Sequence, residues 1–342
     1  MTPRRGPEAQ TVVLTFDYEL FFVGGTVQRC VIRPVDALLA TLRDLDTKAC
    51  FFVDAPMLGR MRQEPAASED LASVTDQIGR IVGAGHRVEL HVHPQWLDAV
   101  WSASRGHWEF TRARSNMLAD LDPSESLGLM RSSAEALLDA ARAADPDYRL
   151  EAFRASGLCA EPFDSIREGM LDLGLTIDCS IAPGTSRSSQ VHAFDYTDAP
   201  RSACWRFHDD PLAPAGDGRL VELPITGTRT RLPAKVLRRI DRAAHPGDYR
   251  IFGDGTWLAS DVTLATRMRS SVRPVTLEAT PPSILRPIME SAGSVVTLIS
   301  HPKAMSPVSL RSLRWLGDAG VRFALPSEIV ARFCPGDARP KH

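Results

Sequence analysis

Apolar positions along the chain follow two periods, which predict strands alternating with amphipathic helices. Residues 11–16 and 49–53 are short apolar runs of the kind that form buried strands. Between them, apolar side chains recur at helical spacing after Pro34, namely at Val35, Leu38, Leu39, Leu42 and Leu45. A strand, an amphipathic helix and a second strand form the repeating unit of an α/β protein.

The order helix, glycine, strand recurs along the chain. A helix from about Ser68 is predicted to end at Gly85, and the strand 86–93 follows at once. Gly174 and Gly320 precede predicted strands in the same way. Because each helix returns the chain to a new strand, the pattern favours a mostly parallel sheet. Further strands are predicted over residues 151–154, 175–179, 205–208, 220–223, 295–299 and 321–325.

Capping and loop signals set the remaining boundaries. Asp122, with Pro123 and Glu125 after it, predicts the start of a helix that runs to about residue 144. Three polar or proline-containing segments are predicted to be loops, over residues 55–69, 182–203 and 210–219.

Composition and charge narrow the class of protein. The 342 residues are 44% hydrophobic and 24% charged, as in ordinary globular proteins. The formal net charge of −2, from 40 basic and 42 acidic residues, argues against a nucleic-acid partner. No run approaches the ~20 apolar residues of a membrane span, and the N-terminus lacks the apolar stretch of a secretory signal. We therefore expect a cytoplasmic protein whose six scattered cysteines are reduced thiols and not metal ligands.

Two pairs of potential metal ligands follow predicted strands. Asp17 and Glu19 come after the first strand, and His91 and His93 lie at the end of the strand 86–93. In extended chain, residues i and i+2 point to the same face, so each pair should project together. Two carboxylates and two imidazoles suit a divalent metal ion such as Zn²⁺.

Polar residues also end the other predicted strands. Asp54, Arg154, Asp178 and His301 occupy these positions. In a parallel βα barrel the carboxyl ends of the strands open on one face, where catalytic groups collect. The general polarity of loops explains any one of these residues but not the choice of Asp, Arg and His. We leave Asp54 out of the predicted site, because a turn residue is the simpler interpretation there.

Taken in order, these segments resemble the five motifs of NodB-homology polysaccharide deacetylases, carbohydrate esterase family 4. The matching segments are TFD (15–17), GHRVELHVHP (85–94), FRASG (153–157), DCS (178–180) and LISHP (298–302). The resemblance spans about residues 11–302 and is nearest to the branch associated with lipopolysaccharide and capsule biosynthesis. It implies an α/β fold, a distorted (β/α)7 barrel with mostly parallel strands.

The chain departs from the family pattern at two ligand positions. The family's first motif has a base Asp followed by a ligand Asp, whereas Tyr18 follows Asp17 here. Its second motif has two histidines four residues apart, whereas Gln95 stands four residues after His91. His93 must then supply the second imidazole. Which of the two carboxylates after the first strand binds metal, and which acts as base, stays open at this point.

The resemblance implies a metal-dependent hydrolase that removes an N-acetyl group from a saccharide or a surface-polysaccharide precursor. It implies that Asp17 is the base, that Arg154 orients it, and that His301 is the general acid. Asp178 is expected near this machinery, tuning His301. The expected metal ligands, for Zn²⁺ or another divalent ion, are Asp17, Glu19, His91 and His93.

Alternatives and domain limits complete these expectations. The enzyme could hydrolyse a non-sugar amide, or the barrel could be catalytically degenerate and bind a glycan, a reading that the changed ligand positions favour. Trp96, Trp101 and Trp108 are expected either to form a sugar platform or to pack their segment onto the barrel.

We expect a disordered tail over residues 1–10, one catalytic barrel over 11–335 with a helical insertion near 94–150, and a C-terminal tail over 336–342.

Overall fold

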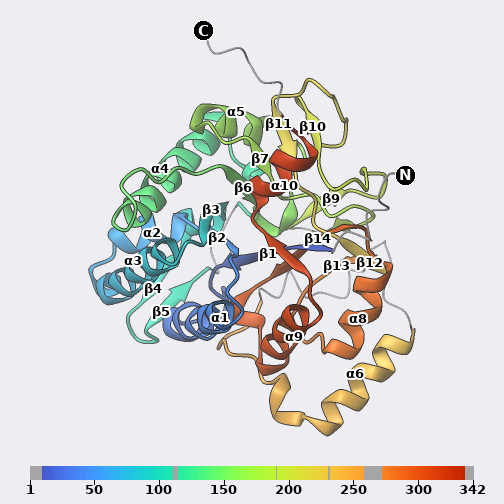
Figure 1. Cartoon of the computed structure of the whole chain (residues 1–342). Coiled ribbons are helices and arrows are strands. Elements are labelled where there is room, and N and C mark those ends of the chain that lie inside the picture. Colours follow the sequence, from blue (N-terminus) through green and yellow to red (C-terminus); the bar gives the residue numbers. More distant parts are fainter. Residues whose placement is uncertain (1–9, 111–114, 190, 230–231, 258–271, 336–342) are drawn as a thin grey trace.

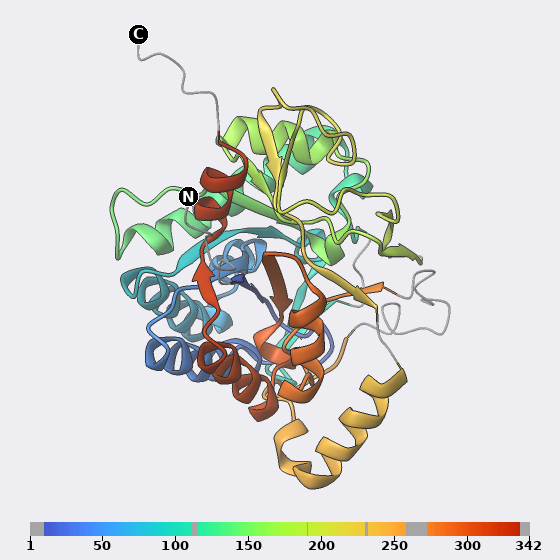
Figure 2. The ribbon, with the colours of Figure 1, turned by 45° about the vertical axis from the view of Figure 1, so that its right-hand side comes forward.

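The chain folds into a curled sheet with helices on its outer face (Figure 1). This computed structural model describes residues 10–110, 115–189, 191–229, 232–257 and 272–335. The two predicted tails lie outside the described residues, except for Gln10. Figure 2 shows the same helices from a second direction, with α6 (Leu232–Ala244) projecting from the body of the molecule.

Nine strands of the described residues form the main sheet. They are β1 (Thr11–Tyr18), β2 (Cys50–Asp54), β3 (Arg87–Val92), β6 (Ala152–Ala155), β7 (Ile177–Asp178), β10 (Trp205–Phe207), β11 (Leu220–Glu222), β14 (Val295–Ser300) and β15 (Arg322–Ala324). The order is β10-β11-β7-β6-β3-β2-β1-β14, and β15 also pairs with β1. All of these pairs are parallel except β10 with β11. The predicted α/β fold, a distorted barrel of mostly parallel strands, is confirmed.

Helices and small two-stranded sheets complete the fold. The other α-helices are α1 (Arg33–Asp44), α2 (Pro56–Arg62), α3 (Ser68–Gly83), α4 (Pro123–Arg142), α5 (Asp164–Leu173), α8 (Pro282–Ser291), α9 (Pro307–Asp318) and α10 (Pro326–Phe333). The small sheets pair β4 (Val100–Ser102) with β5 (His107–Glu109), β8 (Ser186–Ser188) with β9 (Ala193–Asp195), and β12 (Gly227–Arg229) with β13 (Val272–Pro274).

Irregular chain bridges the gap between β11 and β14. The amide of Thr226 donates to Thr297 O at 3.0 Å, and the amide of Thr297 donates to Thr226 Oγ1 at 2.9 Å. Val275 adds two further links, since its amide donates to Thr226 O at 2.8 Å and its carbonyl accepts from Ile299 N at 3.1 Å. The barrel is distorted because these segments, rather than a regular strand pair, complete the circle.

Alternation along the strands separates an apolar shell from a polar interior. Phe16 in β1 and Leu90 and Val92 in β3 belong to the large apolar core that packs under the helices. Asp17 and His91 are their neighbours in sequence and therefore point to the opposite face of the sheet. Since the strands are parallel, their polar residues collect at one end of the barrel interior.

Glycines and a capping box mark helix ends where the sequence predicts them. Gly85, Gly174 and Gly320 have φ angles of +80°, +71° and +71°, a conformation that few other residues adopt easily. The side chain of Asp122 accepts the amide of Glu125 at 2.9 Å at the start of α4. These local signals depend on a few neighbouring residues, which is why sequence reasoning finds them.

The predicted loop over residues 55–69 is wrong, because α2 occupies much of it. Pro56 stands in the first turn of this helix, where its missing N–H is not needed. Met57, Leu58 and Met61 are buried at spacings of one and four residues. The prediction of a loop relied on the Pro, Arg and Ala residues of this segment and overlooked the short helical spacing of its apolar residues.

The tryptophans after β3 serve packing. Trp96 and Trp108 are 1% and 2% exposed, and their ring centroids lie 5.5 Å apart. Phe110 lies 4.8 Å from Trp96, and Trp101 lies 5.4 Å from Trp108. Of the two expected roles, the aromatic cluster supports the packing of the β4–β5 segment onto the barrel.

The expectation that all six cysteines are reduced thiols is wrong for one pair. Cys204 and Cys334 form a disulfide across a sequence separation of 130. The bond joins the chain just before β10 to the end of α10. Spacing in the sequence carries no signal for such a pair, because only the fold brings the two residues together.

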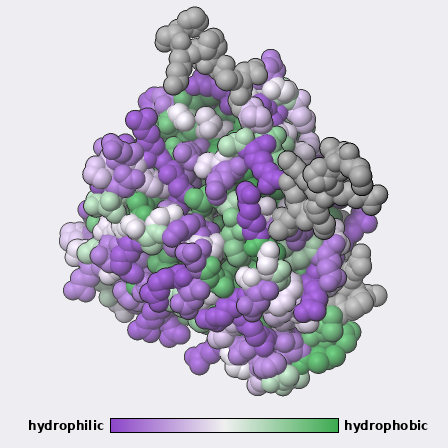
Figure 3. Space-filling view, viewed as in Figure 1, coloured by the Kyte–Doolittle hydropathy of each residue, from purple (hydrophilic) through white to green (hydrophobic). Residues whose placement is uncertain are grey.

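Apolar side chains gather on the surface over α6 (Figure 3). Val236 and Ile240 of this helix are 59% and 61% exposed. The helix therefore adds little to the core that positions the barrel strands. None of the helices in the described part of the chain is both long and apolar enough to cross a bilayer.

Glu89 links β3 to the start of β6 from a position that is 2% exposed. Its carboxylate accepts the amides of Glu151 and Ala152 at 2.8 and 2.9 Å and pairs with Arg87 at 2.7 Å. Glu89→Ala leaves the two amides without this acceptor and removes the buried carboxylate from Arg87, so we expect the free energy of unfolding to fall by about 3–5 kcal/mol.

Urea unfolding followed by circular dichroism measures this loss. Arg43→Ala is the control, because the Arg43 side chain is 80% exposed on α1, and its effect should stay below about 0.5 kcal/mol. A loss of less than about 1 kcal/mol for Glu89→Ala would mean that the link contributes little.

Candidate metal centre and active-site cavity

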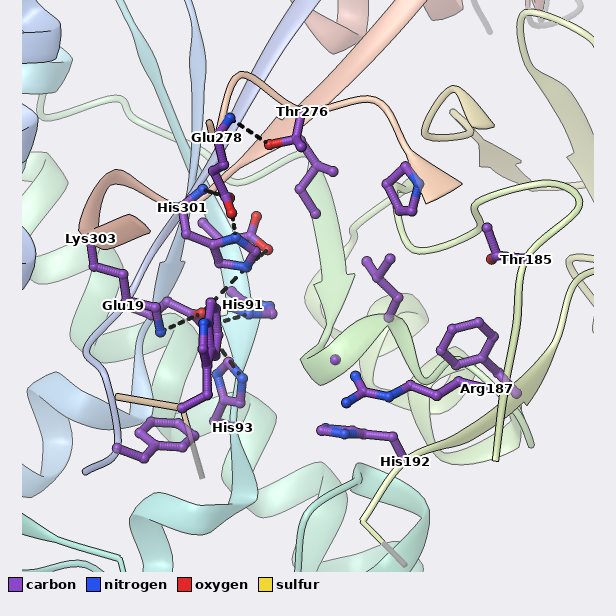
Figure 4. A pocket seen from close by; sticks show the side chains of 18 of the residues that line it. Glu19, His91, His93, Thr185, Arg187, His192, Thr276, Glu278, His301 and Lys303 are labelled. Carbon is purple, nitrogen blue, oxygen red and sulfur yellow. Dashed lines mark hydrogen bonds and ion pairs between the residues drawn. The ribbon is translucent and has the colours of Figure 1, made fainter. Parts of the chain in front are cut away.

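Glu19, His91 and His93 bring one carboxylate and two imidazoles to a single point (Figure 4). Glu19 follows β1, His91 belongs to β3, and His93 follows β3 in extended conformation. Glu19 Oε2 lies 3.3 Å from the Nε2 atom of each histidine. The three potential ligand atoms all lie within 4.8 Å of one another, and all three residues are buried. The period-two spacing thus places both histidines on the same side.

Neighbouring acceptors orient both imidazoles. Nδ1 of His91 lies 2.7 Å from Arg154 O, so a proton on Nδ1 is donated to that carbonyl. Nδ1 of His93 lies 3.2 Å from Asp54 Oδ1, and Trp96 Nε1 donates to the other oxygen of Asp54 at 2.6 Å. Both rings therefore direct Nε2 toward Glu19, the orientation that outer partners impose on metal-binding histidines.

Lys303 forms an ion pair with the other carboxylate oxygen of Glu19, Oε1. Its Nζ lies 2.9 Å from Glu19 Oε1, donates to Leu20 O at 2.5 Å, and lies 4.3 Å from the ring centroid of Trp257. Burial raises the pKa of Glu19, but the charge of Lys303 and contacts with the histidines hold that pKa well below its usual value. The carboxylate is therefore ionised, and its Oε2 atom is left for a cation.

The donor set of this cluster fits a divalent metal ion. Within the described residues, Glu19 Oε2 is buried and has no hydrogen-bond partner. A bound cation would remove the cost of that buried, unsatisfied charge. Two imidazoles and one carboxylate form the ligand set of many catalytic zinc sites, which keep a further position for water. Asp17 is not one of the clustered ligands, so the structure favours Glu19 for the carboxylate.

Asp17 lies between an arginine and a histidine. The fully buried guanidinium of Arg154 pairs with Asp17 Oδ1. The same guanidinium donates to Thr15 Oγ1 and to Cys179 O, each at 2.9 Å. Asp17 Oδ2 lies 3.6 Å from His301 Nε2 and lines the cavity described below. Arg154 is thus placed to orient the Asp17 carboxylate, as the resemblance implies.

Glu278 orients His301. Its Oε1 atom accepts the His301 amide at 2.7 Å and lies 2.7 Å from Nδ1. Nε2 therefore points toward Asp17 and Glu19, at 3.6 and 3.5 Å. Desolvation, the largest single effect, lowers the pKa of His301, but the charge and hydrogen bond of Glu278 together with the charges of Glu19 and Asp17 outweigh it and raise the pKa to about 9. The ring is therefore protonated at neutral pH.

Asp178 lies outside this arrangement. Ser180 Oγ donates to Asp178 Oδ1 at 2.6 Å, and the Asp178 carboxyl group contacts that of Glu222. Burial raises the pKa of Asp178 and raises the pKa of Glu222 well above its usual value. The two groups thus form a buried pair of carboxyl groups. The carboxylate that contacts His301 Nδ1 is that of Glu278 and not that of Asp178, so the expected tuning of His301 by Asp178 stays a prediction.

A cavity of about 570 Å³ opens beside the cluster, a volume typical of small-ligand sites. Its lining includes Asp17, Glu19, His91, His93, Trp257, Glu278, His301 and Lys303 on the metal side, and Arg187, His192 and Phe194 elsewhere. Figure 4 shows Arg187 and His192 facing the cluster across the open space.

The two residues at the family's ligand positions have other contacts. Tyr18 is buried, and its hydroxyl donates to Gln77 Oε1 at 2.9 Å. Gln95 lines the cavity, and its Nε2 lies 3.4 Å from Asn116 Oδ1. Neither belongs to the cluster, which Glu19, His91 and His93 form instead.

Sequence reasoning missed Asp54, Glu278 and Lys303. Asp54 ends a predicted strand as the other site residues do, and only its assignment to a turn excluded it. Lys303 stands two residues after His301, the same spacing that pairs the metal ligands. Glu278 has no sequence signal, because it lies 23 residues before its partner and outside the strands of the main sheet.

The chain is similar to several solved structures. No protein-family model matches the chain, and no curated protein matches it. The chain is similar to a structure described as a polysaccharide deacetylase from Mycobacterium smegmatis, at 13% identity and a TM-score of 0.48 over 97% of this chain and 93% of that one.

Two further solved structures are similar at comparable levels. A family 4 acetyl xylan esterase from Clostridium thermocellum, in complex with a cobalt ion, is 13% identical with a TM-score of 0.40 over 94% of this chain and 91% of the other. A peptidoglycan deacetylase from Bacillus subtilis is 11% identical with a TM-score of 0.39 over 95% and 92% of the two chains. At these identities the likeness concerns the fold, so function has to be argued from the residues of the site.

Asp54→Asn tests whether Asp54 orients His93. Asparagine keeps the shape of the side chain but removes the charge beside Nδ1, so we expect the affinity for Zn²⁺ to fall about 10–100-fold. Competition with a chelating dye measures the dissociation constant. Asp44→Asn, on the exposed face of α1, is the control and should bind as the unchanged protein does. Equal affinities for the two variants would remove Asp54 from the metal centre.

Proposed function

We propose that the protein is a metal-dependent hydrolase that removes an N-acetyl group from a saccharide, with Zn²⁺ as the expected ion. The observation that carries this proposal is the convergence of Glu19, His91 and His93 beside Asp17 and His301 in one cavity. A metal site alone would suit many roles. A metal site with a carboxylate and a protonated histidine next to it suits hydrolysis, which needs a base and an acid.

Glu19, His91 and His93 would hold the ion. When bound, it supplies Lewis-acid chemistry, polarising the acetyl carbonyl and lowering the pKa of a water molecule. Lys303 restrains Glu19 through Oε1, so that Oε2 remains directed at the ion. The partners of the two histidine rings hold the remaining ligands in place.

Asp17 would accept the proton from the attacking water. Its Oδ1 atom is engaged by Arg154, while Oδ2 faces the cavity and His301. One carboxylate oxygen is thus held by a hydrogen-bonded guanidinium and the other is left toward the cavity, where a base must stand. Arg154 also fixes the direction of the carboxylate, because its other N–H groups are bound to Thr15 and Cys179.

His301 would donate the proton to the leaving amine. Expulsion of an amine without a proton is slow, so an acid is needed on the leaving-group side. The contact with Glu278 holds a proton on Nδ1 and leaves the Nε2–H directed into the site. With its pKa raised to about 9, the imidazole carries that proton across the neutral range.

The geometry of the cluster weighs against a degenerate barrel. That alternative depended on the absence of ligands at Tyr18 and Gln95, and the cluster of Glu19, His91 and His93 meets this objection. A non-sugar amide remains the second candidate substrate, since the same chemistry serves any acyl amide. We favour a saccharide because the resemblance to carbohydrate esterase family 4 covers residues of both the cluster and the acid–base pair.

Release of acetate from N-acetylated sugars tests the proposed function. The chain loaded with Zn²⁺ should release acetate from N-acetylglucosamine or its oligomers, and removal of the ion with a chelator should stop the release. Restoration on adding Zn²⁺ back would exclude damage by the chelator. A protein that binds no stoichiometric divalent ion would contradict the proposal, whichever substrate is offered.

His301→Ala separates the acid from the metal centre. We expect kcat to fall about 10²–10⁴-fold, because the leaving amine loses its proton donor. Metal content should stay at one ion per chain, since His301 is not one of the clustered ligands. His208→Ala is the matched control, because His208 is an exposed histidine that pairs with Asp217 far from the cavity lining. Equal turnover in the two variants would exclude His301 as the acid.

A further inference from the structure

Charge is unevenly distributed around the cavity. The lining carboxylates, Asp17, Glu19 and Glu278, all contact His301 and so belong to the metal side. Lys303 on that side is paired with Glu19. The wall that faces them across the cavity carries Arg187 and His192 (Figure 4), and Arg273 also lines the space.

Strand register directs Arg187 into the cavity. In the β8–β9 sheet Arg187 lies directly opposite Phe194. Residues opposite each other in an antiparallel pair project from the same face. Since Phe194 and Arg187 both line the cavity, this face of the β8–β9 sheet forms its wall. His192, in the turn between the two strands, is 5% exposed and lines the same wall.

The β8–β9 sheet is held in place at its base. Gly184 N donates to Tyr196 O at 2.7 Å, and Tyr196 N donates to Thr185 O at 2.9 Å. The Tyr196 hydroxyl donates to Leu158 O at 2.6 Å, next to β6, and the ring stacks on Phe194 at 4.5 Å. We call the cavity face that carries Arg187 and His192 the basic wall. These contacts fix the β8–β9 sheet on the barrel, and the barrel therefore sets the distance between the basic wall and the metal side.

We propose that the cavity takes an N-acylated sugar that carries an anionic group, a phosphate or a carboxylate. This inference rests on the proposed function, since it places the acyl group at Glu19, His91 and His93. The anionic group then lies toward Arg187, whose planar guanidinium forms paired hydrogen bonds with either anion.

Three sugars of matched size test the inference. They are N-acetylglucosamine, N-acetylglucosamine 1-phosphate and 2-acetamido-2-deoxyglucuronic acid. We expect kcat/KM to be about 10–100-fold higher for at least one of the anionic sugars than for the neutral one. Which of the two is preferred identifies the anion. Equal kcat/KM for all three sugars would overturn the inference and leave the proposed hydrolase intact.

Arg187→Ala assigns the preference to one residue. The ratio of kcat/KM between the preferred anionic sugar and N-acetylglucosamine should fall about tenfold or more. Arg187→Lys should restore part of the ratio, because it keeps a charge but loses the planar fork. Arg43→Ala is the control, an exposed arginine on α1 outside the cavity lining. A ratio that is the same in Arg187→Ala and Arg43→Ala would overturn the assignment.

Binding without turnover separates the two proposals. Calorimetry of the His301→Ala variant with N-acetylglucosamine 1-phosphate and with N-acetylglucosamine measures the preference for the anion directly. Tighter binding of the phosphate, lost when Arg187→Ala is added, supports the basic wall even if no acetate is released from any sugar. Absence of acetate release from every sugar would overturn the proposed hydrolase, and the tighter binding of the phosphate would still support an anionic ligand.

Discussion

The buried guanidinium of Arg154 is the interaction on which the rest of the site depends. It pairs with Asp17, donates to Thr15 and to the carbonyl of Cys179, and so ties β6 to β1 and to the chain after β7. The carbonyl of the same residue holds the His91 ring. A charge this deep is tolerated only while its partners are present, so the fold and the site stabilise each other.

Each group of the proposed chemistry has a second residue that fixes it. Asp54 and the Arg154 carbonyl orient the histidines, Lys303 occupies one oxygen of Glu19, and Glu278 holds His301. Buried polar atoms without partners are costly, and these contacts engage most of the charged groups around the cluster. Among the described residues, Glu19 Oε2, which faces both histidines, is one of the buried atoms left without a hydrogen-bond partner. A cation bound there would remove the cost of that unsatisfied charge.

The site also shows how extended chain can bring potential metal ligands together at a changed spacing. Ligands four residues apart normally bridge one helical turn or a loop, whereas His91 and His93 use the two-residue repeat of extended chain. Glu19 uses the same repeat relative to Asp17. Tyr18, between them, points to the other face and packs toward Gln77. Because alternation sets the direction of each side chain, moving a ligand by one position in sequence moves it to a usable face.

The sequence by itself determined the strand and helix order, the shared face of His91 and His93, and the polar ends of the strands. These features arise from local periodicity, which a few neighbouring residues encode. The tertiary structure decided the partners that join distant segments. Glu278 meets His301, Glu222 rather than His301 meets Asp178, and Cys204 meets Cys334 only after the barrel has formed. The reason is physical: the register of parallel strands and the path of irregular chain between β11 and β14 set those distances, and no short-range pattern records them.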